Sequence, residues 1–214
     1  MPVYNSHQLI ELYSNGKFER LSIKNELRVG DELFNNLGRL EDLIPMLESR
    51  FEVAKWRACH IVSEFGDEAL RVFPYAAPLI HSDKASIRDI ACECYRWSAT
   101  TGMQVAEVIK CLEDKSGRVR FRAMLALRDF SKELIQAGVE ALRAEGADRL
   151  SEAIERSLLK GDAKSVAIEI ARKETRLNKL CYYLSALRQG VEGKARLRIM
   201  RRLKEPDLTY FHRR

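Results

Sequence analysis

The chain has 214 residues, of which 46% are hydrophobic and 32% charged, and its formal net charge is +6 at pH 7. This composition excludes a wholly disordered chain, and the length is enough to bury a core without a disulfide or a metal. No apolar run approaches the roughly 20 residues that a membrane-spanning helix needs, so we expect no membrane partner. With only 11 Gly and 5 Pro, few turns are expected, which favours long helices over many short strands.

The N-terminal region predicts capping helices over residues 1–38. Its opening sequence, MPVYNSHQLIELYSNG, has neither the basic start nor the apolar segment of a signal peptide. Ser6 is expected to cap the first helix and Gly16 to end it. The cysteines are odd in number and lie within apolar stretches, which suits reduced thiols in the cytoplasm. They are Cys59, Cys92, Cys94, Cys111 and Cys181.

Three segments in the middle of the chain repeat one pattern. AKWRACHIVSEF starts at Ala54, IRDIACECYRWS at Ile87 and VRFRAMLALRDF at Val119, so the starts lie 33 and 32 residues apart. Each has alanine as its fifth residue, and each follows another amphipathic segment. The repeating unit is therefore a pair of helices, A then B. Because a lone pair cannot bury its apolar face, successive pairs are expected to stack on one continuous core.

These repeats resemble the HEAT-repeat family of armadillo-type folds. The resemblance rests on a run from Asp to Arg-x-x-Ala, which extends from Asp83 to Ala91 and again from Asp114 to Ala123. It covers residues 39–131, although the first copy lacks the Asp and has Lys55 in place of the arginine. The resemblance implies an all-α fold, a right-handed α-α superhelix (a HEAT-like solenoid) of about a dozen helices of roughly 10 to 16 residues.

The succession of helix pairs predicts a single solenoid domain over residues 1–214. Its parts are the capping helices of residues 1–38, the best-matching repeats of residues 39–131, further helix pairs with a basic cap over residues 132–205, and a tail over residues 206–214.

Two arginines lie beside the apolar stripes of the second and third B segments, Arg88 and Arg120. We expect each to bond Asp83 or Asp114 at the turn between helices A and B. Such charge-assisted pairs would fix the angle at which successive pairs stack. Direct ligand binding by these arginines is the alternative.

Helical wheels of the B segments separate an apolar stripe from an opposite face. In HEAT-like solenoids the B helices line the concave side, so the resemblance places this opposite face in one groove. Aromatic side chains on such a face favour a binding surface, and cover by a neighbouring segment is the alternative. The predicted groove contains Trp56, His60, Ser63, Glu64, Asp89, Glu93, Arg96, Trp97, Phe121, Arg122, Leu125, Arg128 and Asp129.

The sequence contains no motif of a phosphate-binding loop, a zinc protease or a serine hydrolase. Cys92 and Cys94 point about 200° apart on a helix, so they cannot share a metal; no metal site and no cofactor are expected. His60, and the pair Asp89 and Glu93 one turn apart, have the chemistry of an acid or base. Such side chains are more often solvated surface groups, so no catalytic residue is predicted.

Charge is distributed unevenly along the chain. Residues 1–170 carry 24 Lys and Arg against 27 Asp and Glu, whereas residues 171–214 carry 13 against 4. The run from Lys194 to Lys204 predicts an amphipathic helix whose basic edge meets nucleic-acid phosphates, an acidic protein or only solvent. No aromatic residue stands among its arginines before Tyr210, which disfavours specific RNA recognition. The basic edge comprises Arg196, Arg198, Arg201 and Arg202.

These features predict a non-enzymatic protein-binding module that grips a partner in the groove, for example an inhibitor or an immunity protein that neutralises a toxin. The first alternative is a nucleic-acid-binding protein, or an enzyme similar to the HEAT-like alkylpurine DNA glycosylases, although their Trp-Asp clusters are not found here. A HEAT enzyme of the pigment-lyase kind is the remaining alternative. The material that co-purifies with the nuclease-treated protein distinguishes these classes.

Overall fold

The structure of the chain, a computed structural model, describes residues 5–20 and 23–155. Every regular element in these residues is a helix, so the all-α prediction is confirmed for this part of the chain. The chain divides into two compact units, Met1–Ser98 and Ala99–Arg214, and each is described by itself. Superhelical stacking and a single domain over residues 1–214 stay predictions.

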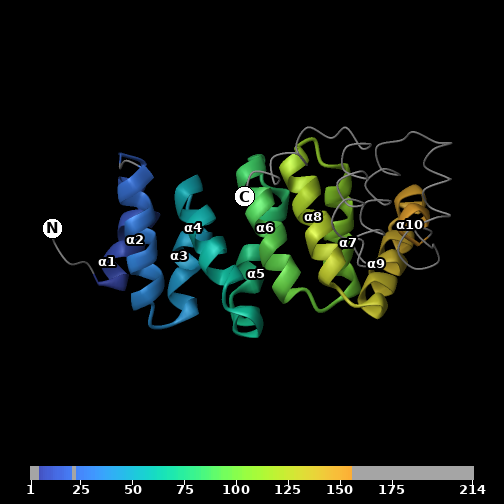
Figure 1. The fold of residues 1–214 in the computed structure, drawn as a ribbon, viewed down its shortest axis with the longest axis horizontal. Coiled ribbons are helices and arrows are strands. Elements are labelled where there is room, and N and C mark those ends of the chain that lie inside the picture. Colours follow the sequence, from blue (N-terminus) through green and yellow to red (C-terminus); the bar gives the residue numbers. More distant parts are fainter. Residues whose placement is uncertain (1–4, 21–22, 156–214) are drawn as a thin grey trace, which may run out of the picture. The chain divides into compact units, whose positions relative to one another are not determined.

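Figure 1 shows the helices in chain order. Unit 1 contains α1 (Ser6–Ser14), η1 (Lys17–Arg20), α2 (Ile23–Asn36), η2 (Leu40–Leu43), α3 (Ile44–Leu47), α4 (Glu52–Ser63), η3 (Gly66–Arg71), α5 (Phe73–Ala76), η4 (Ala77–His81) and α6 (Ala85–Ser98), where η denotes a 3-10 helix. The described part of unit 2 contains α7 (Gly102–Lys110), η5 (Cys111–Glu113), α8 (Gly117–Asp129), α9 (Lys132–Ala144) and α10 (Asp148–Ile154).

The start of α1 lies one residue away from the predicted cap. Asn5 is the N-cap, because its side-chain Oδ1 accepts a hydrogen bond of 2.9 Å from the backbone N–H of Gln8. The side-chain Oε1 of Gln8 in turn accepts one of 3.0 Å from the backbone N–H of Asn5. This reciprocal pair satisfies two backbone donors, so the assignment of the cap to Ser6 is wrong by one residue. Gly16 follows the helix end with φ +70°, a conformation that favours glycine.

The segments predicted as the first and second A helices are broken into short pieces. α3 and α5 have four residues each, and 3-10 turns flank them. Proline stands at the first or second position of α3, α5 and η4, as Pro45, Pro74 and Pro78. Proline suits a helix start but lacks the N–H that would continue the helix before it. The expected length of roughly 10 to 16 residues is therefore wrong for these segments and right for α4, α6 and α8, which have 12, 14 and 13.

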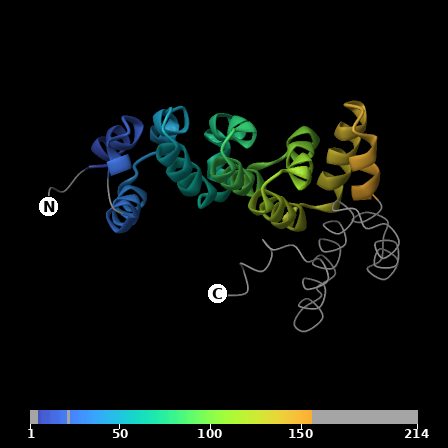
Figure 2. The same cartoon turned by 90° about the horizontal axis from the view of Figure 1, so that it is seen from above.

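Unit 1 is a double row of helices. Figure 2 shows α1, α3 and α5 along one side and α2, α4 and α6 along the other. α1 contacts α3, α3 contacts α5, and α4 contacts α6. The buried guanidinium of Arg57 on α4 lies against Gly30 of α2, where an added Cβ would stand 2.2 Å from Arg57 Cζ. Glycine thus leaves room for the Arg57 guanidinium against α2.

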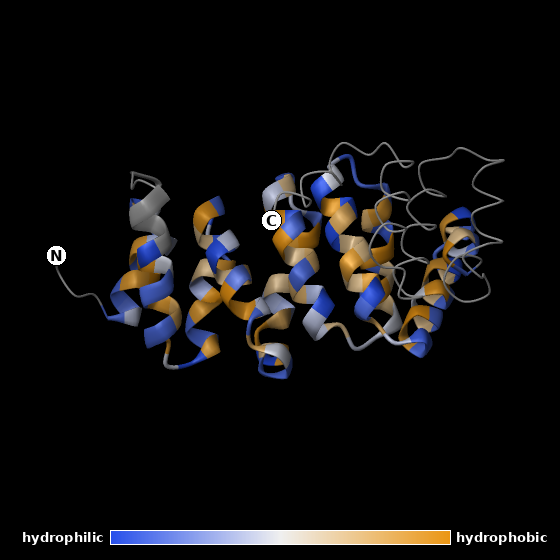
Figure 3. Ribbon diagram, in the orientation of Figure 1, coloured by the Kyte–Doolittle hydropathy of each residue, from blue (hydrophilic) through white to orange (hydrophobic). Residues whose placement is uncertain are grey.

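In unit 2, α7 contacts both α8 and α9, and α9 contacts α10. Two glycines mark the approach of α7 to α9. A Cβ on Gly102 would stand 2.4 Å from the backbone oxygen of Ala137, and one on Gly138 would stand 2.6 Å from Val105 Cγ1. Figure 3 shows hydrophobic and hydrophilic residues on different sides of the helices in each unit, as expected of amphipathic helices.

The arginines of the repeated motif make the same contact in each unit. Arg88 Nη1 donates to the backbone oxygen of Ser82 at 2.7 Å, and Arg120 Nη1 donates to that of Asp114 at 3.0 Å. Each acceptor lies six residues before its arginine, in the turn that precedes the B helix. The expected partners were the carboxylates of Asp83 and Asp114, whereas these bonds reach backbone carbonyls. In each case the guanidinium provides a hydrogen-bond donor to a backbone carbonyl at the end of a 3-10 helix.

Candidate binding face on helices α4 and α6

Only part of each predicted groove face is open to solvent. At the eleventh position of the repeated segments, Glu64, Trp97 and Asp129 are all exposed. At the seventh position, His60, Glu93 and Leu125 are all half-buried. The wheels therefore place these two positions correctly, whereas Ser63, at the tenth position of the first segment, was expected in the groove but is buried, with 7% exposure.

At the third position the expectation is wrong for two of three segments. Asp89 is only 3% exposed and Phe121 only 5%, whereas Trp56 is half-buried. On α6 every residue from Ile87 to Cys92 is buried, so this stretch has no solvent side. A wheel assumes one buried stripe along the whole helix, and that assumption fails where neighbouring elements surround a helix completely.

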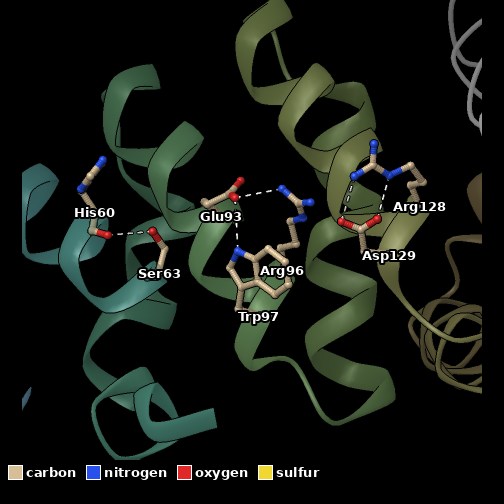
Figure 4. A network of polar contacts seen from close by, with 7 residues as sticks. All are labelled: His60, Ser63, Glu93, Arg96, Trp97, Arg128 and Asp129. Carbon is tan, nitrogen blue, oxygen red and sulfur yellow. Dashed lines mark hydrogen bonds and ion pairs between the residues drawn. The ribbon is translucent and has the colours of Figure 1, made fainter. Parts of the chain in front are cut away.

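Trp97 is the large exposed residue at the end of α6, with 46% of its surface accessible. Its Nε1–H donates to Glu93 Oε1 at 3.3 Å, and the same oxygen accepts from Arg96 Nη1 at 3.0 Å. The Arg96 guanidinium lies over the indole ring, with Cζ 4.5 Å from the ring centroid. Figure 4 shows these three side chains together. The indole is therefore exposed and held in one orientation.

The helix that carries Trp97 is itself fixed to its neighbours within unit 1. Cys94 Sγ–H donates to the backbone oxygen of Cys59 on α4 at 3.2 Å. Tyr95 packs edge-on against Phe73 at 4.9 Å between ring centroids, and its hydroxyl donates to the backbone oxygen of Ala77 at 3.3 Å. The last turn of α6 is thus anchored on α4, α5 and η4, which gives Trp97 a rigid base.

α4 contributes a second aromatic group. The rings of Trp56 and His60 stack with centroids 5.2 Å apart, and the buried Arg57 places its Cζ 5.3 Å from the Trp56 centroid. Figure 4 shows His60 and Glu93 on the adjacent helices α4 and α6. Glu64 caps the end of α4 and is exposed. We call the set Trp56, His60, Glu64, Glu93, Arg96 and Trp97 the α4–α6 face.

The other predicted groove residues belong to unit 2. Arg122, Leu125 and Arg128 are half-buried on α8. Arg128 forms two bonds with the carboxylate of Asp129, of 2.7 and 3.1 Å (Figure 4). Adjacent residues that pair in this way neutralise each other at the end of α8. The structure brings Trp56 and Trp97 into one unit; a groove that also includes α8 stays a prediction.

The residues with acid–base chemistry lie in different surroundings. Asp89 is buried, while Glu93 is bound to Arg96 and Trp97. In the part of the chain that the structure describes, no three His, Cys, Asp or Glu side chains are grouped to hold a metal ion. Within the same residues, no helix is both long enough and apolar enough to pass through a bilayer. The basic edge and Cys181 lie outside the described residues.

Sequence reasoning missed a cleft in unit 1. Its volume is about 340 Å³, and Phe34 lies beside it with its ring 5.6 Å from that of Phe65. No periodic signal could have revealed the cleft, because it forms between the end of α2 and η3. Its lining residues are Leu37, Gly38, Arg39, Leu40, Glu41, Phe65, Glu68 and Arg71.

The chain was compared with models of known protein families, and none of them matches. No curated protein matches its sequence either.

Proposed function

We propose that the chain is a protein-binding module and that its α4–α6 face contacts the partner. The observation that carries the proposal is Trp97, which is exposed over 46% of its surface although a hydrogen bond to Glu93 and the guanidinium of Arg96 hold it in place. Exposed tryptophan is costly in water, and rigid aromatic residues are enriched among the residues that dominate binding energies. A fixed indole loses little entropy when a partner binds.

The repeated helix pairs support a HEAT-like solenoid as the framework of this module. The spacing of 33 and 32 residues and the equivalent contacts of Arg88 and Arg120 favour such a framework. An inhibitor, such as an immunity protein that neutralises a toxin, is the kind of binder we propose. A face without a grouped set of reactive side chains suits a binder better than an enzyme.

The test is a Trp97→Ala variant with two readouts. We expect partner affinity to fall by about 2 kcal/mol or more, as for buried interface aromatics. The free energy of unfolding should fall by only about 1 kcal/mol, because the side chain gives up one hydrogen bond and one cation–π contact. Binding is measured by quantifying the proteins that each variant captures from an extract of the cells that produce it. Stability is measured by urea denaturation.

Tyr75→Ala is the matched control, since Tyr75 on α5 is an aromatic residue of 41% exposure outside the α4–α6 face. We expect it to capture the same proteins as the wild type. Equal capture by Trp97→Ala would contradict the proposal, and so would unfolding as severe as that of the core variant Leu43→Ala, about 2–5 kcal/mol.

A second candidate function is nucleic-acid binding through the basic edge. The excess of 13 Lys and Arg over 4 Asp and Glu in residues 171–214 favours it. Contacts from such an edge to phosphates would be independent of sequence and sensitive to salt. A preparation purified without nuclease from which no nucleic acid is recovered would count against it.

A further inference from the structure

The exposed part of Trp97 is apolar, because its polar group is already bonded. The indole N–H is the only polar group of the side chain, and it donates to Glu93 Oε1 at 3.3 Å. One face of the ring carries the Arg96 guanidinium, 4.5 Å from the centroid. What remains for a partner is the hydrocarbon edge and the other face.

The charges beside the indole are also paired with each other. The Glu93 carboxylate and the Arg96 guanidinium lie 3.0 Å apart, and their side chains are only 14% and 15% exposed. A charged group of the partner would have to compete with this pair. The position that a cation would occupy over the ring is taken by Arg96 on one side.

Glu64 adds a negative charge to the α4–α6 face. It occupies the same place in the repeated segment as Trp97, at the end of the adjacent helix α4, and it is exposed. A carboxylate at the border of an apolar contact favours a basic residue of the partner, mainly through orientation and rate of association.

From this arrangement we infer that Trp97 takes an uncharged aliphatic or proline side chain from a polypeptide partner, and that a basic residue next to it pairs with Glu64. The inference rests on the proposed function and adds the chemistry of the partner. Proline suits the open indole face because its ring is rigid and loses little entropy on binding. Arg96 is a specificity residue here, since it occupies one of the two ring faces that a cation could take.

The test uses a displayed library of random peptides, selected in parallel against the wild type, Trp97→Ala and Arg96→Gln. The wild type should enrich aliphatic residues or proline next to Lys or Arg. The selected peptides should bind Trp97→Ala at least about tenfold more weakly, and Glu64→Gln should lose the preference for the flanking basic residue. Arg96→Gln leaves the ring face open, so it should enrich Lys or Arg at the position that contacts the indole.

Two results would overturn the inference alone: a wild type that already enriches cations in a Trp97-dependent manner, or peptides that bind Trp97→Ala as well as the wild type. A wild type that enriches no peptide would overturn the proposed function as well. Thermal unfolding by circular dichroism checks each variant. If Arg96→Gln does not fold, the comparison of the wild type with Trp97→Ala and Glu64→Gln still decides the outcome.

Discussion

At the scale of single residues, Gly102 shows how closely two helices of unit 2 approach each other. A Cβ at this position would stand 2.4 Å from the backbone oxygen of Ala137 and 2.6 Å from its carbonyl carbon. A backbone atom inside a helix cannot move aside as the end of a long side chain can. The absence of a side chain at Gly102 is therefore a packing requirement of α7 against α9.

We predict that Gly102→Ala lowers the free energy of unfolding by about 1–3 kcal/mol, the usual cost of overpacking, despite the better helix propensity of alanine. Gly38→Ala is the control, since its Cβ would meet nothing closer than Asp42 Oδ2 at 4.0 Å. Urea denaturation measures both. Equal midpoints for Gly102→Ala and the wild type would show that α7 and α9 lie further apart.

Cys94 is a buried thiol that ties stability to pH. Its hydrogen bond with Cys59 and its complete burial raise the pKa of the Cys94 thiol well above its ordinary value. A raised pKa in the folded state means that the folded chain keeps a proton which the unfolded chain releases. The stability from this thiol is therefore complete at low pH and is lost as pH rises above the unfolded value of about 8.5.

Above a pH of about 8.5, we predict that the free energy of unfolding falls more steeply for the wild type than for Cys94→Ala. The difference in slope is up to about 1.4 kcal/mol per pH unit. The comparison is between the two pH dependences, because other groups titrate equally in both proteins. Chemical denaturation at closely spaced pH values up to about 10 gives both curves. Parallel curves would mean that Cys94 ionises as easily when folded as when unfolded.

At the scale of helices, the repeated alanine of the B segments lies where packing is tightest. Ala91 in α6 and Ala123 in α8 have no accessible surface, and Ala58 in α4 has none either. A larger side chain at these positions has no open volume to enter. The small residue predicted for close packing is thus found in the core of each unit.

We predict that Ala91→Leu and Ala123→Leu each destabilise the protein by roughly 1–3 kcal/mol through overpacking. Ala144→Leu in α9 is the matched control, because Ala144 is exposed and leucine is also a good helix former. Unfolding midpoints in urea decide the matter. Core variants that unfold at the same concentration as the wild type would show spare volume around the alanines.

Ion pairs link the helices of unit 2 at their ends. Lys110 on α7 lies 2.7 Å from Glu107 and 2.6 Å from Glu145 after α9, and these two carboxylates raise the pKa of Lys110 although partial burial acts against them. Arg149 on α10 lies 2.7 Å from Glu113 in η5. These pairs are at least partly exposed, so each contributes little stability. They help to orient helices whose cohesion comes from apolar packing.

At the scale of the whole molecule, residues 1–170 are mildly acidic in sequence and residues 171–214 are basic.

We predict that any nucleic-acid binding is non-specific and weak at physiological salt. Neutralising Arg196, Arg198, Arg201 and Arg202 together should reduce the slope of log K against log salt concentration by about 3–4, because four phosphate contacts are lost. Fluorescence anisotropy with labelled duplexes at several salt concentrations measures the slope. A slope that the four substitutions leave unchanged would assign the binding to other residues.

The helical class, the places of the B helices and the exposure of Glu64, Trp97 and Asp129 could be predicted from the sequence alone. These follow from the 3.6-residue period, from the repeated alanine, and from the scarcity of Gly and Pro. The same helical period placed Trp97 and Glu64 on the side opposite the apolar stripe, where both are exposed. The prolines indicate where the A segments break, because proline has no backbone N–H to continue a helix.

Which side chains of the face are covered depends on the packing of the helices around them. Asp89 and Phe121 have the periodicity of surface positions but are buried, because helix packing covers residues 87–92 of α6 and residues 119–121 of α8. The same packing fixes α6 through Cys94 and Tyr95 and leaves Trp97 rigid at its end. A wheel records the angle of a residue around one helix, whereas burial depends on every helix that packs against it.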